Sequence, residues 1–190
     1  MVHKQDATWL MSYKDSQRNH LKYIFLAANS RFKGRNDMKK YEKARALKAR
    51  VEDIRAKYRA LMKDSDATQC QLATATYLID FLALRVGNEK GEDEADTVGC
   101  CSIRVEHVDF LEDNQVTFDF LGKDSMRYLN TVKLSQQGWE NLKSFAKNKN
   151  PKEDLFHLVS ASRLNDFLKQ FMPGLSAKVF RTYNASCTLE

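Results

Sequence analysis

Residues 115–133, QVTFDFLGKDSMRYLNTVK, hold two runs of β-forming residues separated by a short turn sequence. In the first run, apolar side chains alternate with polar ones, as in a strand that buries one face: Val116, Phe118 and Phe120. The turn, Gly122 to Ser125, has typical hairpin chemistry and would place Lys123 at its tip. A further alternating run precedes this pair. The sequence therefore predicts a small three-stranded antiparallel sheet over 101–108, 115–121 and 126–133.

Upstream of this sheet the pattern changes to helical spacing. Over residues 38–61, apolar residues recur every three or four positions, which predicts one long basic helix. Asn36 or Asp37 can cap its start. Before it, aromatic and β-branched residues predict two short strands at 8–13 and 22–28.

A second helix is expected over about 68–84, apolar on more than one face and therefore largely buried. Gly87 would follow its C-terminus as the residue that ends the helix. Three shorter helices are expected after the sheet, starting at Ser135, at Ser160 or Ser162, and at Ser176. The pattern as a whole predicts an α+β fold that is mostly helical.

Charge is distributed unevenly along the 190 residues. The chain has 31 Lys and Arg against 25 Asp and Glu, but residues 1–63 hold 17 of the basic residues and only 6 of the acidic ones. Such a basic segment indicates either a surface for a polyanion or a solvated helix face, and charge alone leaves both interpretations open. No apolar run is long enough for a transmembrane helix, and the first residues do not resemble a secretory signal.

Motifs for metal or nucleotide chemistry are missing from the sequence. Four cysteines form no CxxC pair, so we expect reduced thiols in an intracellular protein and no zinc site: Cys70, Cys100, Cys101 and Cys187. The acidic run 89–96 could hold a metal, although a solvated loop is the better interpretation. Three cations stand at structurally special places, where they could meet one phosphate: Arg85 at a helix end, Lys123 on the hairpin and Arg181 near the C-terminus.

Six segments resemble the eukaryotic nuclear type IB DNA topoisomerases. They are LKYIFLAANSRFKG (21–34), KKYEKARALK (39–48), ALRVGNEK (83–90), EADTVGCCSIRVEHV (94–108), FDFLGKDSMRY (118–128) and GLSAKVFRTYNAS (174–186). The resemblance runs from about Trp9 to the end without a large gap. It implies a tyrosine recombinase-like catalytic core, with residues 1–30 as the C-terminal β piece of a neighbouring subdomain and residues 31–190 as a catalytic subdomain truncated at its C-terminal end.

The resemblance also implies a reaction and its residues. A tyrosine oxygen attacks a DNA phosphodiester, the 5′-hydroxyl leaves, and a 3′-phosphotyrosine remains until the strand is resealed. Arg85 and Arg181 would stabilise the charge on the non-bridging oxygens, and Lys123 would protonate the leaving oxygen. No metal or other cofactor is expected. The family's nucleophilic tyrosine and catalytic histidine would lie beyond residue 190, and its cap domain would precede residue 1.

Further positions carry over from the family as contacts to duplex DNA, the expected partner. They are Trp9, Lys22, Tyr23, Lys40, Arg85, Val86, Gly87, Asn88, Glu89, Lys90, Thr97, Ser176, Ala177 and Lys178. Asp124 would lie where camptothecin-type poisons meet the protein–DNA interface, and the resemblance places the enzyme in the nucleus. The abrupt end at Glu190 favours a fragment that is inactive alone. Two alternatives remain: a non-catalytic DNA-binding module, and the large-subunit piece of a split enzyme whose second chain brings the tyrosine.

Overall fold

The computed structural model describes residues 9–17, 19–27, 29–87 and 96–189. Contacts divide the chain into a smaller unit, Met1–Glu42, and a larger unit, Lys43–Glu190. The subdomain boundary predicted after residue 30 concerns the family's larger architecture and stays a prediction. Within the described ranges, no helix has both the length and the apolar character needed to cross a bilayer.

The smaller unit consists of a hairpin and the first part of a helix. Strands β1 (Met11–Lys14) and β2 (Leu21–Ile24) pair antiparallel, with Met11 opposite Ile24. Both strands are shorter than predicted. Helix α1 (Arg31–Lys48) begins in this unit and passes its boundary after Glu42.

The prediction of one long basic helix is wrong. The helix begins earlier, at Arg31, and ends at Lys48, and a separate helix α2 covers Val51–Leu61. The N–H of Arg50 donates to the carbonyl of Leu47, which closes a turn between the two helices. Leu47 and Val51 are both buried in the same core. Apolar spacing therefore continues across the turn, and periodicity alone could not reveal the break.

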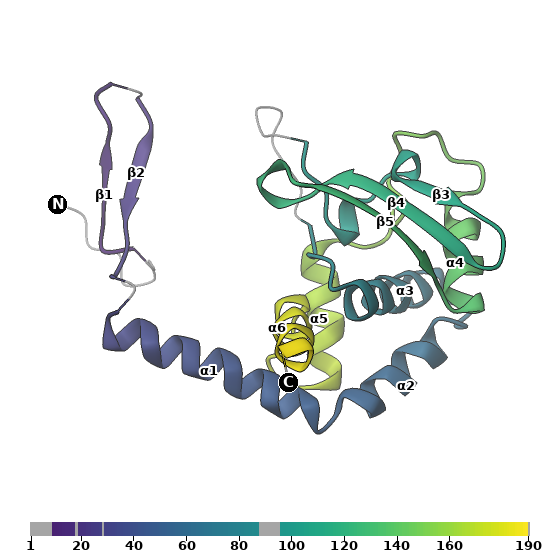
Figure 1. Cartoon of the computed structure of the whole chain (residues 1–190), viewed down its shortest axis with the longest axis horizontal. Helices are drawn as coiled ribbons and strands as arrows, with labels where there is room; N and C mark the ends of the chain where they lie inside the picture. The colour runs from purple at the N-terminus through teal and green to yellow at the C-terminus, as the bar shows by residue number, and fades with distance from the viewer. Residues whose placement is uncertain (1–8, 18, 28, 88–95, 190) are drawn as a thin grey trace. The chain divides into compact units, whose positions relative to one another are not determined.

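Helix α3 (Ala67–Leu82) is the centre of the larger unit. Asp66 caps it by accepting the N–H of Thr68 at 2.8 Å. Most of its residues are buried, as predicted, because α2, α4, α5 and α6 all contact it and the three-stranded sheet lies on one side of it (Figure 1). It ends at Leu82, earlier than expected, and Ala83 follows in the left-handed conformation with φ of 52°.

The sheet has the order β3-β4-β5, with β3 (Val108–Phe110), β4 (Gln115–Leu121) and β5 (Arg127–Lys133) antiparallel. The predicted hairpin is confirmed, with Phe120 opposite Tyr128. The strand predicted over 101–108 is wrong, because Cys100–Ser102 and Val105–His107 form 3-10 turns, η1 and η2. Backbone groups of residues 100–106 bond residues 85–86 and 151–155, and pairing with β4 begins at Val108.

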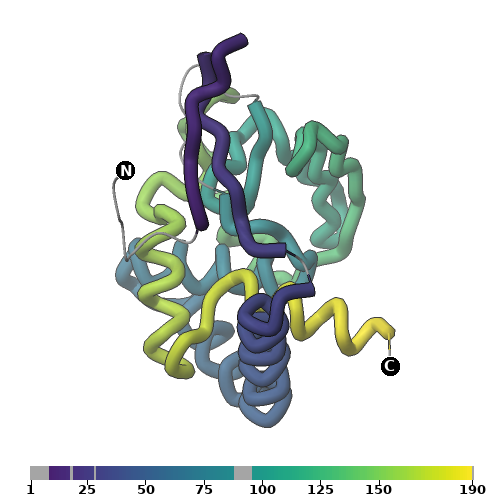
Figure 2. Tube along the Cα trace, turned by 90° about the vertical axis from the view of Figure 1, so that its left-hand side faces the viewer, coloured from purple at the N-terminus to yellow at the C-terminus, as the bar shows by residue number. Residues whose placement is uncertain are grey.

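The remaining helices are α4 (Gln136–Ala146), α5 (Ala161–Phe171) and α6 (Ala177–Leu189). The predicted caps are confirmed, since Ser135 accepts the N–H of Gly138 and Ser160 accepts that of Arg163. The first turns of α6 are buried through Val179 and Phe180. Its last turns are largely exposed and extend from the body of the larger unit (Figure 2).

Candidate functional site

The segment after α3 positions Arg85. Leu84 is buried, which anchors the chain directly before the exposed Arg85. The carbonyl of Arg85 accepts the N–H of Cys100, and the carbonyl of Val86 accepts the N–H of Cys101, both at 2.7 Å. These two bonds hold the backbone of Arg85 against η1. The exposed side chain of Arg85 therefore extends from a fixed backbone position.

Two glycines cross closely at the end of this segment. Gly87 has φ of 80°, and a Cβ on it would lie 2.9 Å from the Cα of Gly99. A Cβ on Gly99 would overlap the backbone nitrogen and Cα of Gly87. Only glycine at both positions permits this approach. Gly87 is therefore not the residue that ends α3, as the sequence suggested, but one side of a backbone crossing.

Arg181 lies on α6 and reaches back to the end of α3. Its Nε donates to the carbonyl of Ala83 at 2.8 Å. Burial lowers the pKa of the Arg181 guanidinium from its usual range, and the positive charge of Arg85 lowers it further. Arg181 thus bonds the backbone two residues before Arg85, and the two positive charges interact.

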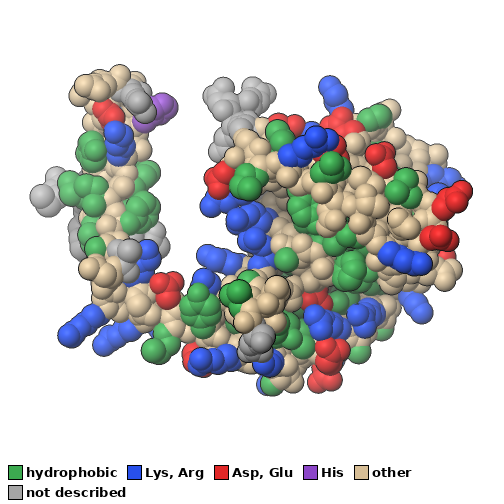
Figure 3. Space-filling view, in the orientation of Figure 1, with side chains coloured by type: hydrophobic (Ala, Val, Ile, Leu, Met, Phe, Trp, Pro, Cys, Tyr) green, Lys and Arg blue, Asp and Glu red, His purple; other side chains and the backbone are tan. Residues whose placement is uncertain are grey.

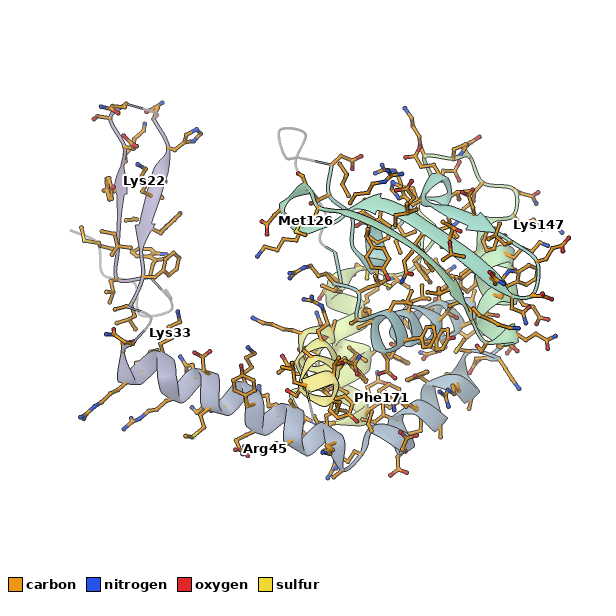
Figure 4. The ribbon with its side chains drawn as sticks, in the orientation of Figure 1. Lys22, Lys33, Arg45, Met126, Lys147 and Phe171 are labelled. Carbon is orange, nitrogen blue, oxygen red and sulfur yellow. The ribbon has the colours of Figure 1, made fainter. Side chains whose placement is uncertain are left out.

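Lys123 lies at the exposed tip of the β4–β5 hairpin, in a short 3-10 turn, η3 (Lys123–Ser125). The carbonyl of Met126 accepts the N–H of Gly122 at 2.8 Å, which closes the turn, and Asp124 has a φ of 61°. Met126 is 72% exposed at this tip (Figure 4). Lys and Arg side chains gather on the larger unit below the hairpin tip (Figure 3).

The other predicted contact residues have varied surroundings. In the smaller unit, the rings of Trp9 and Tyr23 lie 5.6 Å apart and Lys22 pairs with Asp15 at 2.6 Å. The ammonium of Lys40 lies 4.8 Å from the ring centre of Tyr41. Thr97 is half-buried. The remaining predicted positions 88–90 fall outside the described residues.

At the start of α6, the predicted contacts differ in exposure. Lys178 is exposed and Ser176 is half-buried. Ala177 is buried, and its N–H donates to the side chain of Asn165 at 3.3 Å. In the described part of the chain, no three His, Cys, Asp or Glu side chains group closely enough to hold a metal ion.

Sequence reasoning missed a buried polar cluster beside the arginines. The carboxylate of Asp80, on α3, accepts two hydrogen bonds from Arg55 and one from the hydroxyl of Tyr58, at 2.8 to 3.0 Å. The backbone carbonyl of Asp80 accepts the side-chain amide of Asn184 at 2.6 Å. The available signal was that Asp80 is the one charged residue of this buried helix.

The family model described as eukaryotic DNA topoisomerase I, catalytic core, matches residues 29–190. The chain belongs to this family. The resemblance drawn from the sequence is confirmed, and so is the α+β fold.

Relatives from fungi and animals support the assignment. The chain is 53% identical over 188 residues to DNA topoisomerase 1 of Schizosaccharomyces pombe, covering 98% of this chain and 23% of that protein. It is 52% identical over 189 residues to DNA topoisomerase 1 of Candidozyma auris, covering 99% of this chain and 25% of that protein. It is 49% identical over 194 residues to the human DNA topoisomerase 1, covering 99% of this chain and 25% of that protein. The chain thus spans about a quarter of the length of these topoisomerase I relatives.

Proposed function

We propose that this chain is part of the catalytic core of a nuclear type IB DNA topoisomerase. The complete enzyme would relax supercoiled DNA by cutting one strand through a 3′-phosphotyrosine and resealing it, without metal or ATP. The observation that supports the proposal is the bond of Arg181 to the carbonyl of Ala83, two residues before Arg85, in a chain that belongs to this family.

Two neighbouring guanidiniums suit the charge that develops in this reaction. In the transition state, negative charge gathers on the non-bridging oxygens of the attacked phosphate. An arginine fork can bond these oxygens through two N–H groups and stays charged at any working pH. Arg181 uses Nε for the carbonyl of Ala83, so its two terminal nitrogens remain for the phosphate. Arg85 would meet the same phosphate from the segment after α3.

Lys123 has a different proposed role. As a tyrosine oxygen outside this sequence bonds to phosphorus, the bond between phosphorus and the 5′-oxygen breaks. The leaving oxygen then takes a proton from the ammonium of Lys123. Its place on an exposed hairpin tip supports this role, because a narrow hairpin can approach the minor groove.

The remaining contact residues stay proposals of the same kind. Lys22, Lys40 and Lys178 would bind phosphates, and Trp9 and Tyr23 would lie against the DNA. Asp124, next to Lys123, would be the residue nearest to camptothecin-type poisons.

A bridging sulfur substitution separates the proposed roles. In a complete topoisomerase I carrying this sequence over its matching stretch, Arg85→Ala and Arg181→Ala should each slow cleavage by about 10²–10³. Lys123→Ala should slow it by roughly 10²–10⁴. With sulfur in place of the 5′-bridging oxygen, the thiolate leaves without an acid, so only Lys123→Ala should recover. Equal rescue of all three variants, or of none, would contradict this division of roles.

A further inference from the structure

The C-terminal end of α3 is held by side chains from α6. Because α3 ends at Leu82, its last carbonyls have no partner further along the helix. Two of the carbonyls at this end accept hydrogen bonds from α6: that of Asp80 from Asn184 at 2.6 Å, and that of Ala83 from Arg181 at 2.8 Å. Asn184 and Arg181 are three positions apart, so they share one face of their helix.

Asp80 is itself immobilised from the other side. Its side chain is only 4% exposed, and its carboxylate is bonded by the Nε and Nη2 atoms of Arg55 and by the hydroxyl of Tyr58. Burial and the charge of Asp80 raise the pKa of Tyr58, which keeps its hydroxyl protonated as a donor. The carbonyl that receives Asn184 therefore belongs to a residue fixed to α2 as well as to α3.

The position of Arg181 needs such support. The guanidinium of Arg181 is repelled by that of Arg85, and its partial burial removes some of its hydration. Both effects disfavour a charged side chain at this position. Ala83, whose carbonyl receives Nε, stands in a left-handed conformation that alanine rarely adopts. The place of Arg181 thus involves charge repulsion from Arg85 and backbone strain at Ala83, and neighbouring contacts must offset both.

We infer that Asn184 is a positioning residue for Arg181: its hydrogen bond to the carbonyl of Asp80 fixes α6 against the end of α3, so that Arg181 keeps Nε on Ala83 and turns its terminal nitrogens to the phosphate beside Arg85. The inference rests on the proposed function. It extends that function to a residue that would not touch the DNA.

The first experiment measures single-turnover cleavage and DNA affinity in a complete topoisomerase I carrying this sequence. Asn184→Ala should slow cleavage about 10-fold to 100-fold, because small misplacements of a catalytic group have effects of this size. The dissociation constant for the uncleaved DNA should stay within about twofold. Ser186→Ala is the matched control, since the Ser186 hydroxyl donates only to the carbonyl of Thr182 on its own helix. This control should cleave at the unsubstituted rate.

A double-mutant cycle separates positioning from general damage to the fold. If Asn184 acts through Arg181, then Asn184→Ala should add little to the defect of Arg181→Ala. It should still add its full factor to the defect of Lys123→Ala. A full additive effect in the Arg181→Ala background would overturn the inference.

A second variant separates loss of the hydrogen bond from unfolding of the protein. Asn184→Asp keeps the size of the side chain but cannot donate to the carbonyl of Asp80 when ionised. It should show the same slow cleavage, and a cooperative thermal transition above the assay temperature checks that the variant is folded. If Asn184→Asp cleaves at the unsubstituted rate while Arg181→Ala is slow, the inference fails and the proposed function stands. If Arg181→Ala also cleaves normally, the proposed function fails.

Discussion

At the scale of single residues, the crossing of Gly87 and Gly99 holds the base of Arg85. Gly99→Ala would place a Cβ onto the backbone of Gly87 and 3.0 Å from the carbonyl oxygen of Arg85. Backbone atoms cannot move aside as a flexible side chain can. We expect Gly99→Ala to lower the free energy of unfolding by about 1–3 kcal/mol, the range for overpacking. Chemical denaturation measures this change.

Gly34→Ala is the matched control, because a Cβ on Gly34 in helix α1 meets nothing within 4 Å. Alanine favours a helix interior over glycine by about 0.5–1 kcal/mol, so this substitution should raise stability. A Gly99→Ala variant as stable as the unsubstituted chain would show that the crossing can relax.

At the scale of elements, α1 is the most basic helix of the chain and carries the predicted contact Lys40. Reversing Lys39, Lys40 and Lys43 to Glu should weaken binding to all duplex sequences alike, because phosphate contacts carry little sequence information. Lys39 and Lys43 are exposed and Lys40 is half-buried, and surface substitutions usually change the free energy of unfolding by less than about 0.5 kcal/mol each. Fluorescence anisotropy with two unrelated duplexes in low salt measures the effect.

Lys147→Glu with Lys152→Glu is the control for this element, since both lysines are exposed and lie outside the predicted contacts. This pair of reversals should weaken binding less than the α1 variant does. If the α1 variant retains full affinity in low salt, α1 is a solvated basic helix and not a DNA contact.

At the scale of the whole molecule, the uneven charge and the family's division of catalytic groups lead to one expectation. The 190-residue chain alone should bind duplex DNA but not cleave it, because the resemblance assigns the nucleophilic tyrosine and the catalytic histidine to segments outside this sequence. Binding should fall steeply with salt, by about 0.9 in the log–log slope for each neutralised phosphate. A plasmid relaxation assay tests the expected lack of cleavage. Metal-independent relaxation of a supercoiled plasmid by the pure chain would show that the nucleophile lies within these 190 residues.

Local chemistry was sufficient for much of the fold. The hairpin with Lys123 at its tip follows from alternation and a turn sequence, and the caps Ser135 and Ser160 follow from a side chain that bonds an N–H three residues on. Each depends on residues close in sequence. By contrast, periodicity could not reveal the turn at Arg50, because Leu47 at the end of α1 and Val51 at the start of α2 are both buried in one core.

What the sequence by itself determined is the family, the α+β class and the identity of Arg85, Lys123 and Arg181 as candidates, because long specific segments and local patterns carry that information. Only the tertiary structure decided that residues 100–106 bond to residues 85–86 and 151–155, and that pairing with β4 begins at Val108. It alone placed Arg181 beside Arg85 and revealed the bond of Asn184 to Asp80. The physical reason is that each of these contacts joins segments that are distant in the chain, and their geometry is set by packing on a shared core that no local pattern encodes.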